Sequence, residues 1–218
     1  MKMIGYWNYT VILTFMSLAS TVIGITMACE NKFTHAIIFL AFSGLFDAFD
    51  GKVARTKKNR TEDEKLYGIQ LDSLCDVICF GVFPVILCLK MGMHGILGCI
   101  SMIVYCIAAV TRLAFFNVLE MNRQQEEDSP VNKFYHGLPV TSIAVIFPLV
   151  YLVNYWISRD CKDVVLDVML VATAALFVLD FKVKKPSDKQ LISMISMVAV
   201  VLLISIYFYH KSWLMFWR

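Results

Sequence analysis

The sequence predicts an all-α protein, a polytopic bundle of helices that cross a membrane. Of the 218 residues, 59% are hydrophobic and only 17% are charged, and the mean hydropathy is +0.68. Soluble domains carry about 25% charged residues. The composition therefore favours an integral membrane protein over a soluble domain of this size.

Seven apolar runs each have close to the roughly 20 residues that a helix needs to cross a bilayer. The first run is long and is followed by Cys29 and Glu30 rather than by a small-residue cleavage site, so we expect it to be retained. No stretch indicates a separate soluble domain, and residues 1–218 are expected to form a single membrane domain. The candidate spans cover residues 9–28, 34–51, 69–89, 94–117, 138–157, 163–181 and 190–209.

Interface residues and helix breakers support this assignment along the chain. Tyr6, Trp7 and Tyr9 lie at the start of the first span, where aromatic side chains anchor a helix to the membrane surface. The third span contains Gly81 and Pro84. These two residues favour a kink or an opened backbone, which membranes tolerate where the segment faces a cavity.

Two pairs of aspartates interrupt the apolar pattern. Asp47 and Asp50 end the second span, and Asp72 and Asp76 open the third. Spacings of three and four residues place each pair on one helix face, and a short polar connection can bring the two faces together. Four gathered carboxylates repel one another and are costly to desolvate unless cations neutralise them. Hard divalent ions with oxygen ligands, Mg²⁺ or Mn²⁺, suit this set.

Small residues and one arginine accompany the aspartates. Gly51, Ala54 and Gly68 keep the neighbouring helix faces bare, which leaves room for a bulky group against the backbone. Arg55 lies beside them and offers a planar guanidinium suited to phosphate. The sequence therefore predicts a phosphate-binding metal site where the second and third spans meet.

The distribution of basic residues predicts the orientation of this site. Cytoplasmic connections of membrane proteins carry an excess of Lys and Arg, so the two most basic connections are expected to face the cytoplasm together with the aspartates. Attraction to anionic lipid heads is a simpler role for most of these side chains. The basic residues are Lys52, Arg55, Lys57, Lys58, Arg60 and Lys65 in one connection, and Lys182, Lys184, Lys185 and Lys189 in the other.

The aspartate-rich stretch resembles the signature of the CDP-alcohol phosphotransferase family, D-x-x-D-G-x-x-A-R followed by G-x-x-x-D-x-x-x-D. The chain reads D-A-F-D-G-K-V-A-R and then G-I-Q-L-D-S-L-C-D, with every lettered position filled. The twelve residues 56–67 between the two halves exceed the family's usual spacing. Because added loop length costs little free energy, we expect a longer polar loop between undisturbed helices.

The resemblance implies a six-helix membrane core, a homodimer and a site with two Mg²⁺ or Mn²⁺ ions. By the family pattern Asp76 would be the catalytic base, and it would share metal binding with the other three aspartates. The donor, CDP-diacylglycerol, would lie against the small residues, and Arg55 would hold a phosphate. The implied metal ligands are Asp47, Asp50, Asp72 and Asp76, and the implied donor-binding residues are Gly51, Ala54, Arg55 and Gly68.

Further segments resemble the phosphatidylserine synthase branch of this family. They are D-S-L-C-D-V-I-C-F-G-V-F-P at 72–84, T-R-L-A-F-F-N-V in the fourth span and F-Y-H-G-L-P-V-T before the fifth. Phe115 replaces a second arginine of that branch. The resemblance implies transfer of a phosphatidyl group to L-serine with release of CMP. Arg112 either snorkels to the interface or is paired inside the bundle, where it could serve the acceptor pocket.

Other functions are compatible with parts of the pattern. The acceptor could be glycerol-3-phosphate or an inositol phosphate, although those would favour a denser cationic pocket. A divalent-cation transporter would place its site near the bilayer midplane between internal repeats, and no repeat is found. A catalytically silent scaffold is disfavoured because all four carboxylates are present. We expect a prokaryotic cell membrane as the location, lipid and soluble substrates, and no nucleic-acid partner.

Overall fold

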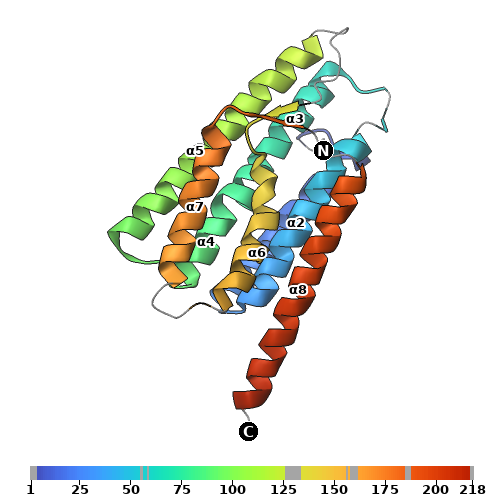
Figure 1. The fold of residues 1–218 in the computed structure, drawn as a ribbon. Coiled ribbons are helices and arrows are strands. Elements are labelled where there is room, and N and C mark those ends of the chain that lie inside the picture. The colour runs from blue at the N-terminus through green and yellow to red at the C-terminus, as the bar shows by residue number, and fades with distance from the viewer. Residues whose placement is uncertain are drawn as a thin grey trace.

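The computed structural model describes residues 4–54, 56–57, 59–125, 134–155, 157, 162–184 and 188–216. Long helices run roughly side by side through this part of the chain (Figure 1). The predicted helical membrane bundle is confirmed. The α-helices are α1 (Ile12–Cys29), α2 (Phe33–Ala54), α3 (Glu62–Asp76), α4 (Phe83–Lys90), α5 (Gly95–Gln125), α6 (Ile143–Tyr155), α7 (Lys162–Val178) and α8 (Asp188–Phe216).

Every predicted span coincides largely with a helical segment. By length and hydropathy, four of the described segments could each cross a membrane, and Val140–Asn154 forms a shorter apolar helix. Short 3-10 turns precede two of the helices, at Tyr9–Val11 and Val140–Ser142. The four long segments are Tyr9–Cys29, Glu62–Lys90, Gly95–Asn122 and Lys189–Phe208.

The opened backbone expected from Gly81 and Pro84 is a π-helical segment, Val77–Val82, between α3 and α4. An α-helix would bond the Phe80 carbonyl to the N–H of residue 84, and proline has none. The Tyr105 hydroxyl of α5 donates instead to the Phe80 carbonyl at 2.6 Å, and the Tyr105 side chain is fully buried. A side chain of a neighbouring helix thus satisfies the carbonyl that the proline leaves open.

Replacing Tyr105 with phenylalanine removes this hydrogen bond and leaves the Phe80 carbonyl buried without its donor. Because an unsatisfied buried polar group costs about 1–3 kcal/mol, we expect Tyr105→Phe to unfold at a lower temperature or denaturant concentration. Thermal unfolding in detergent measures the loss. Tyr207→Phe on exposed α8 is the matched control, and equal stability of both variants would contradict this role for Tyr105.

The start of α3 corrects the predicted loop. The connection was expected to run through 56–67 and the third span to begin near residue 69, but α3 begins at Glu62. The Thr61 side chain accepts from the Glu64 backbone N–H, and the Glu64 side chain accepts from the Thr61 N–H, which is a capping box. Three acidic residues in the first turn also favour the positive end of the helix dipole. These local signals extend the helix beyond its apolar run.

Close contacts between small and hydroxyl side chains hold α2 in place. The Ser17 and Ser43 hydroxyls of α1 and α2 lie 2.7 Å apart in the buried interface, and Thr21 donates to Ser43 at 3.0 Å. On the side toward α6, a Cβ built on Gly44 would lie 2.5 Å from the Ala144 Cβ. Such close approach is typical of helix pairs in membranes. It fixes the end of α2 that carries Asp47 and Asp50.

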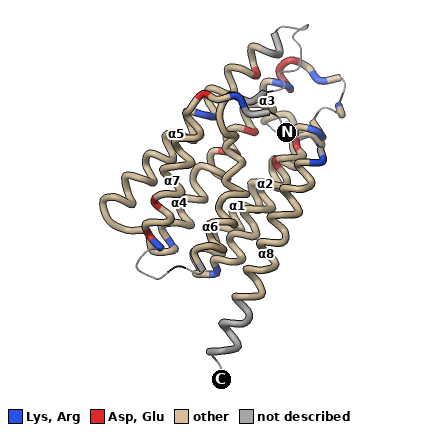
Figure 2. The backbone as a smooth tube through the Cα atoms, in the orientation of Figure 1, with Lys and Arg blue, Asp and Glu red and all other residues tan. Residues whose placement is uncertain are grey.

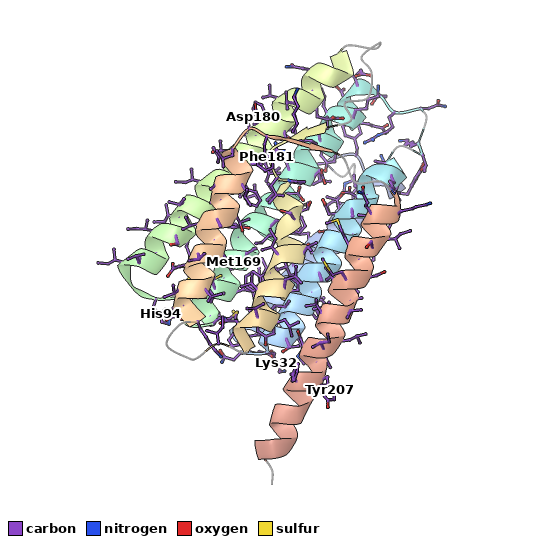
Figure 3. The ribbon with its side chains drawn as sticks, in the orientation of Figure 1. Lys32, His94, Met169, Asp180, Phe181 and Tyr207 are labelled. Atoms are coloured by element: carbon purple, nitrogen blue, oxygen red, sulfur yellow. The ribbon has the colours of Figure 1, made fainter. Side chains whose placement is uncertain are left out.

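One short antiparallel strand pair departs from the all-helical prediction. Strand β1 (Phe134–His136) pairs with β2 (Lys182–Lys184) and ties the connection before α6 to the connection before α8. The N–H of Gly137, a glycine at φ +73°, donates to the Phe181 carbonyl at 2.7 Å. Figure 3 shows Asp180 and Phe181 at this end of the bundle and Lys32 and His94 at the opposite end.

Candidate active site

The four predicted aspartates come together where α2 ends and α3 continues into the bundle. Carboxylate oxygens of Asp47, Asp50 and Asp72 all lie within 4.8 Å of one another. Asp76 lies beside Asp47, and Asp72 lies beside Asp50. Asp76 is the most buried of the four, with 8% of its surface exposed. The spacing argument therefore placed all four carboxylates correctly in one cluster.

Hydroxyl and amide groups orient the helices that carry the carboxylates. Thr14 of α1, which is buried, donates through Oγ1 to Asp50 Oδ2 at 3.1 Å. Ser73, next to Asp72, donates to Asn117 Oδ1 of α5 at 2.6 Å. Sequence reasoning did not identify Thr14, because a lone threonine in an apolar run has many possible roles. Its partner lies 36 positions away in the chain.

Replacing Thr14 with valine keeps the side-chain shape and removes the hydrogen bond to Asp50. Because such a bond is worth about 0.5–1.5 kcal/mol, we expect the turnover of the proposed reaction described below to fall by about 2- to 12-fold. Thr14→Ser should restore most of the loss, since it returns the hydroxyl. Initial rates at saturating metal measure both variants, and a serine variant no better than valine would show that the hydroxyl does not position Asp50.

The cluster suits divalent cations in two respects. Its ligand atoms are carboxylate oxygens, and one of these oxygens has no hydrogen-bond partner among the described residues. The grouped ligand atoms belong to carboxylates, the ligand type that Mg²⁺ and Mn²⁺ prefer. Asp72 Oδ1 is buried and has no hydrogen-bond partner among the described residues. A buried carboxylate oxygen without a donor is unfavourable unless a cation coordinates it. The residues therefore match the metal ions that the sequence predicts.

Three of the predicted donor-binding residues lie near this cluster on α2 and α3. Gly51 and Ala54 are half-buried in the last turns of α2, and Gly51 lines the same cavity as the aspartates. Gly68 lies one turn before Asp72 on α3, and a Cβ there would lie 2.7 Å from Nη2 of Arg60. The Arg60 guanidinium thus covers the face of α3 at Gly68. From the sequence alone, Arg60 was interpreted only as part of a basic connection. Arg55 lies outside the described residues.

Arg112 is paired inside the bundle rather than snorkelling to the interface. Only 5% of its surface is exposed, and its Nε donates to the Leu138 carbonyl at 3.1 Å. Arg112 also lines the cavity that contains the aspartates. The Arg112 guanidinium therefore lies in the wall of the cavity that the four aspartates also line.

The cavity changes from polar to apolar along its length. Its volume is about 960 Å³. One part is lined by the four aspartates and Arg112, and the other part by apolar side chains of three helices. In Figure 1 these helices, α2, α6 and α8, stand next to one another, and α8 contacts both α2 and α6. The apolar lining includes Ile38, Phe42, Val145, Ile195, Val198 and Leu202.

Charged residues gather at the end of the bundle where α3 begins, a smaller group lies at the opposite end, and the middle of the bundle carries few of them (Figure 2). A sequence model of the family described as CDP-alcohol phosphatidyltransferase matches residues 7–179, a stretch that includes all four aspartates. This chain belongs to the CDP-alcohol phosphatidyltransferase family. The family resemblance inferred from the motif is confirmed, and α8 lies beyond the matched residues.

Several curated relatives of this chain have closely related names. A CDP-diacylglycerol–serine O-phosphatidyltransferase of Saccharomyces cerevisiae is 31% identical over 127 residues, which cover 58% of this chain and 45% of that protein. One of Methanocaldococcus jannaschii is 27% identical over 159 residues, covering 72% and 69%. An archaetidylserine synthase of Methanothermobacter thermautotrophicus is 28% identical over 170 residues, covering 76% and 66%. The chain thus spans less than half the length of the yeast relative.

Proposed function

We propose that this chain transfers a phosphatidyl group from CDP-diacylglycerol to L-serine, forming phosphatidylserine and CMP. The observation that carries the proposal is a carboxylate cluster in a cavity whose other part is apolar. CDP-diacylglycerol has a matching polar part, its charged nucleotide head, and a matching apolar part, its two acyl chains. Family membership and the names of the relatives support the same activity.

The carboxylates would hold the metal ions. Asp47, Asp50, Asp72 and Asp76 are the proposed ligands of two Mg²⁺ or Mn²⁺ ions, with Thr14 orienting Asp50. Bound ions would neutralise the pyrophosphate and stabilise the charge that develops on the CMP leaving group.

Asp76 is the proposed base. Its carboxylate accepts the proton of the serine hydroxyl as the serine oxygen bonds to the phosphorus of the phosphatidyl group, and the bond from that phosphorus to the CMP oxygen breaks. Asp76 is more buried than Asp72 and lies one turn further along α3. Proton acceptance there would be shielded from water.

The remaining predicted residues receive binding roles. Gly51 and Ala54 would leave room for the cytidine, and Arg55 would hold a phosphate. At Gly68 the donor would meet the Arg60 guanidinium that covers this face of α3. Arg112, buried in the cavity wall, is suited to the carboxylate of serine, because a guanidinium binds carboxylates through parallel hydrogen bonds. The acyl chains would lie along the apolar part of the cavity between α2, α6 and α8.

The orientation and assembly are proposed from the charge pattern and the family. The basic connection after α2 would place the aspartates at the cytoplasmic surface, where serine and CMP are dissolved. We also propose a homodimer in a prokaryotic cell membrane, with all described helices in a single membrane domain. Crosslinking in native vesicles would measure the oligomeric state.

One assay tests the reaction and the acceptor together. Purified protein receives labelled CDP-diacylglycerol with Mg²⁺ or Mn²⁺, and serine, glycerol-3-phosphate and inositol phosphate are offered in turn. We expect labelled phosphatidylserine only with serine, and CMP in equal amount. A product formed with glycerol-3-phosphate or inositol phosphate would support the transfer reaction. It would identify that compound, rather than serine, as the acceptor. Metal transport by sealed vesicles without any transfer would favour the transporter interpretation.

A further inference from the structure

The segment between α2 and α3 places an arginine directly on the bare face of Gly68. Nη2 of Arg60 lies 2.7 Å from the position that a Gly68 Cβ would occupy, and it donates to the Glu64 carbonyl at 3.2 Å. Nε of Arg60 is buried and has no hydrogen-bond partner among the described residues. The guanidinium therefore has one N–H that the described residues leave unsatisfied.

Neighbouring contacts hold this arginine in place. Lys57 forms an ion pair with Glu64 at 2.8 Å, and the two side chains are 25% and 16% exposed. The same Glu64 side chain completes the capping box with Thr61, directly after Arg60. The segment is thus attached at two points to the first turn of α3, although it is longer than the usual connection of the family.

The position of Arg60 relates it to the metal site. Gly68 and Asp72 are four residues apart on α3, so their side-chain positions lie on one face about 5–6 Å apart. The guanidinium over Gly68 is therefore about one helical turn from a proposed metal ligand. A ligand that contacts both the Arg60 guanidinium and the aspartate site must carry negative charge near Arg60. It must also coordinate the metal ions that the aspartates would hold.

We propose that Arg60 binds the diphosphate of the nucleotide donor, an assignment that rests on the proposed function. A guanidinium offers N–H groups in a fixed fork that matches phosphate oxygens, and its charge persists at every physiological pH. A phosphate oxygen would also satisfy the buried Nε, which has no hydrogen-bond partner among the described residues. The added residues of the connection thus supply a donor-binding residue beyond the family motif.

The test measures binding of CDP and of cytidine to the full-length protein in detergent with Mg²⁺, by calorimetry. We expect Arg60→Ala to weaken CDP binding by about 10- to 100-fold, the worth of hydrogen bonds to a charged group. Cytidine binding should change less than about twofold, because cytidine has no phosphate. Arg60→Gln provides a second variant with a side chain of similar length. Lys65→Ala is the matched control, because Lys65 forms an ion pair with Glu62 at the start of α3.

The outcomes separate this assignment from the proposed function. Wild-type affinity for CDP in both Arg60 variants would overturn the role of Arg60 while leaving the reaction intact. An equal loss for cytidine would show contact with the base and would overturn the phosphate assignment. If the wild-type protein bound neither CDP nor CDP-diacylglycerol, the proposed function itself would fail. Thermal unfolding of each variant confirms that binding is measured on folded protein.

Discussion

Asp50→Asn and Asp72→Asn are each expected to reduce phosphatidyl transfer by about 10²- to 10³-fold or more. Each substitution removes a charged oxygen from the carboxylate cluster, and loss of one group that stabilises transition-state charge has an effect of this size. Excess chelator should abolish transfer by the wild-type protein, and added Mg²⁺ or Mn²⁺ should restore it. Initial rates with labelled CDP-diacylglycerol measure both effects.

Binding of Mn²⁺, followed by electron paramagnetic resonance, gives a second readout that does not depend on catalysis. Both asparagine variants should bind Mn²⁺ more weakly than the wild-type protein. Asp163→Asn, in the exposed first turn of α7, is the matched control and should behave as wild type. Full transfer in excess chelator would show that the reaction does not need metal ions. Unchanged Mn²⁺ binding in both variants would show that Asp50 and Asp72 are not metal ligands.

Asp76→Asn is expected to separate proton transfer from donor binding. If Asp76 is chiefly the base, the variant should still bind CDP-diacylglycerol and Mn²⁺ and should lose transfer to serine by about 10²- to 10⁴-fold, the usual contribution of a positioned base. Asparagine has nearly the same shape as aspartate, so the buried site should remain folded. Donor binding and turnover are measured on the same preparation.

Two results would contradict this role for Asp76. Loss of donor binding together with turnover would identify Asp76 chiefly as a metal ligand, since Asp76 lines the same cavity as the other three aspartates. Persistent turnover would show that another group accepts the serine proton. Asp72→Asn is the comparison, because the two residues lie one turn apart on α3 and only Asp76 is proposed to act as the base.

The sequence predicted those parts of the molecule that follow from local spacing. Apolar runs of about 20 residues predicted the helices, because a span must satisfy its own backbone in lipid. Gly81 and Pro84 predicted the opened segment Val77–Val82. Asp72 and Asp76 share a face of α3 because they are four residues apart.

Contacts between residues far apart in the chain were decided by the tertiary structure. Tyr105 meets the Phe80 carbonyl and Thr14 meets Asp50 only because α5 and α1 pack beside the segments that carry those partners. Arg60 covers Gly68 because the capping box starts α3 earlier than the apolar pattern indicates. Hydropathy reports how a residue partitions between water and lipid, whereas a hydrogen-bond partner depends on which helix faces it. The sequence by itself therefore determined the helices and the carboxylate cluster, and packing between helices decided which side chains orient and surround that cluster.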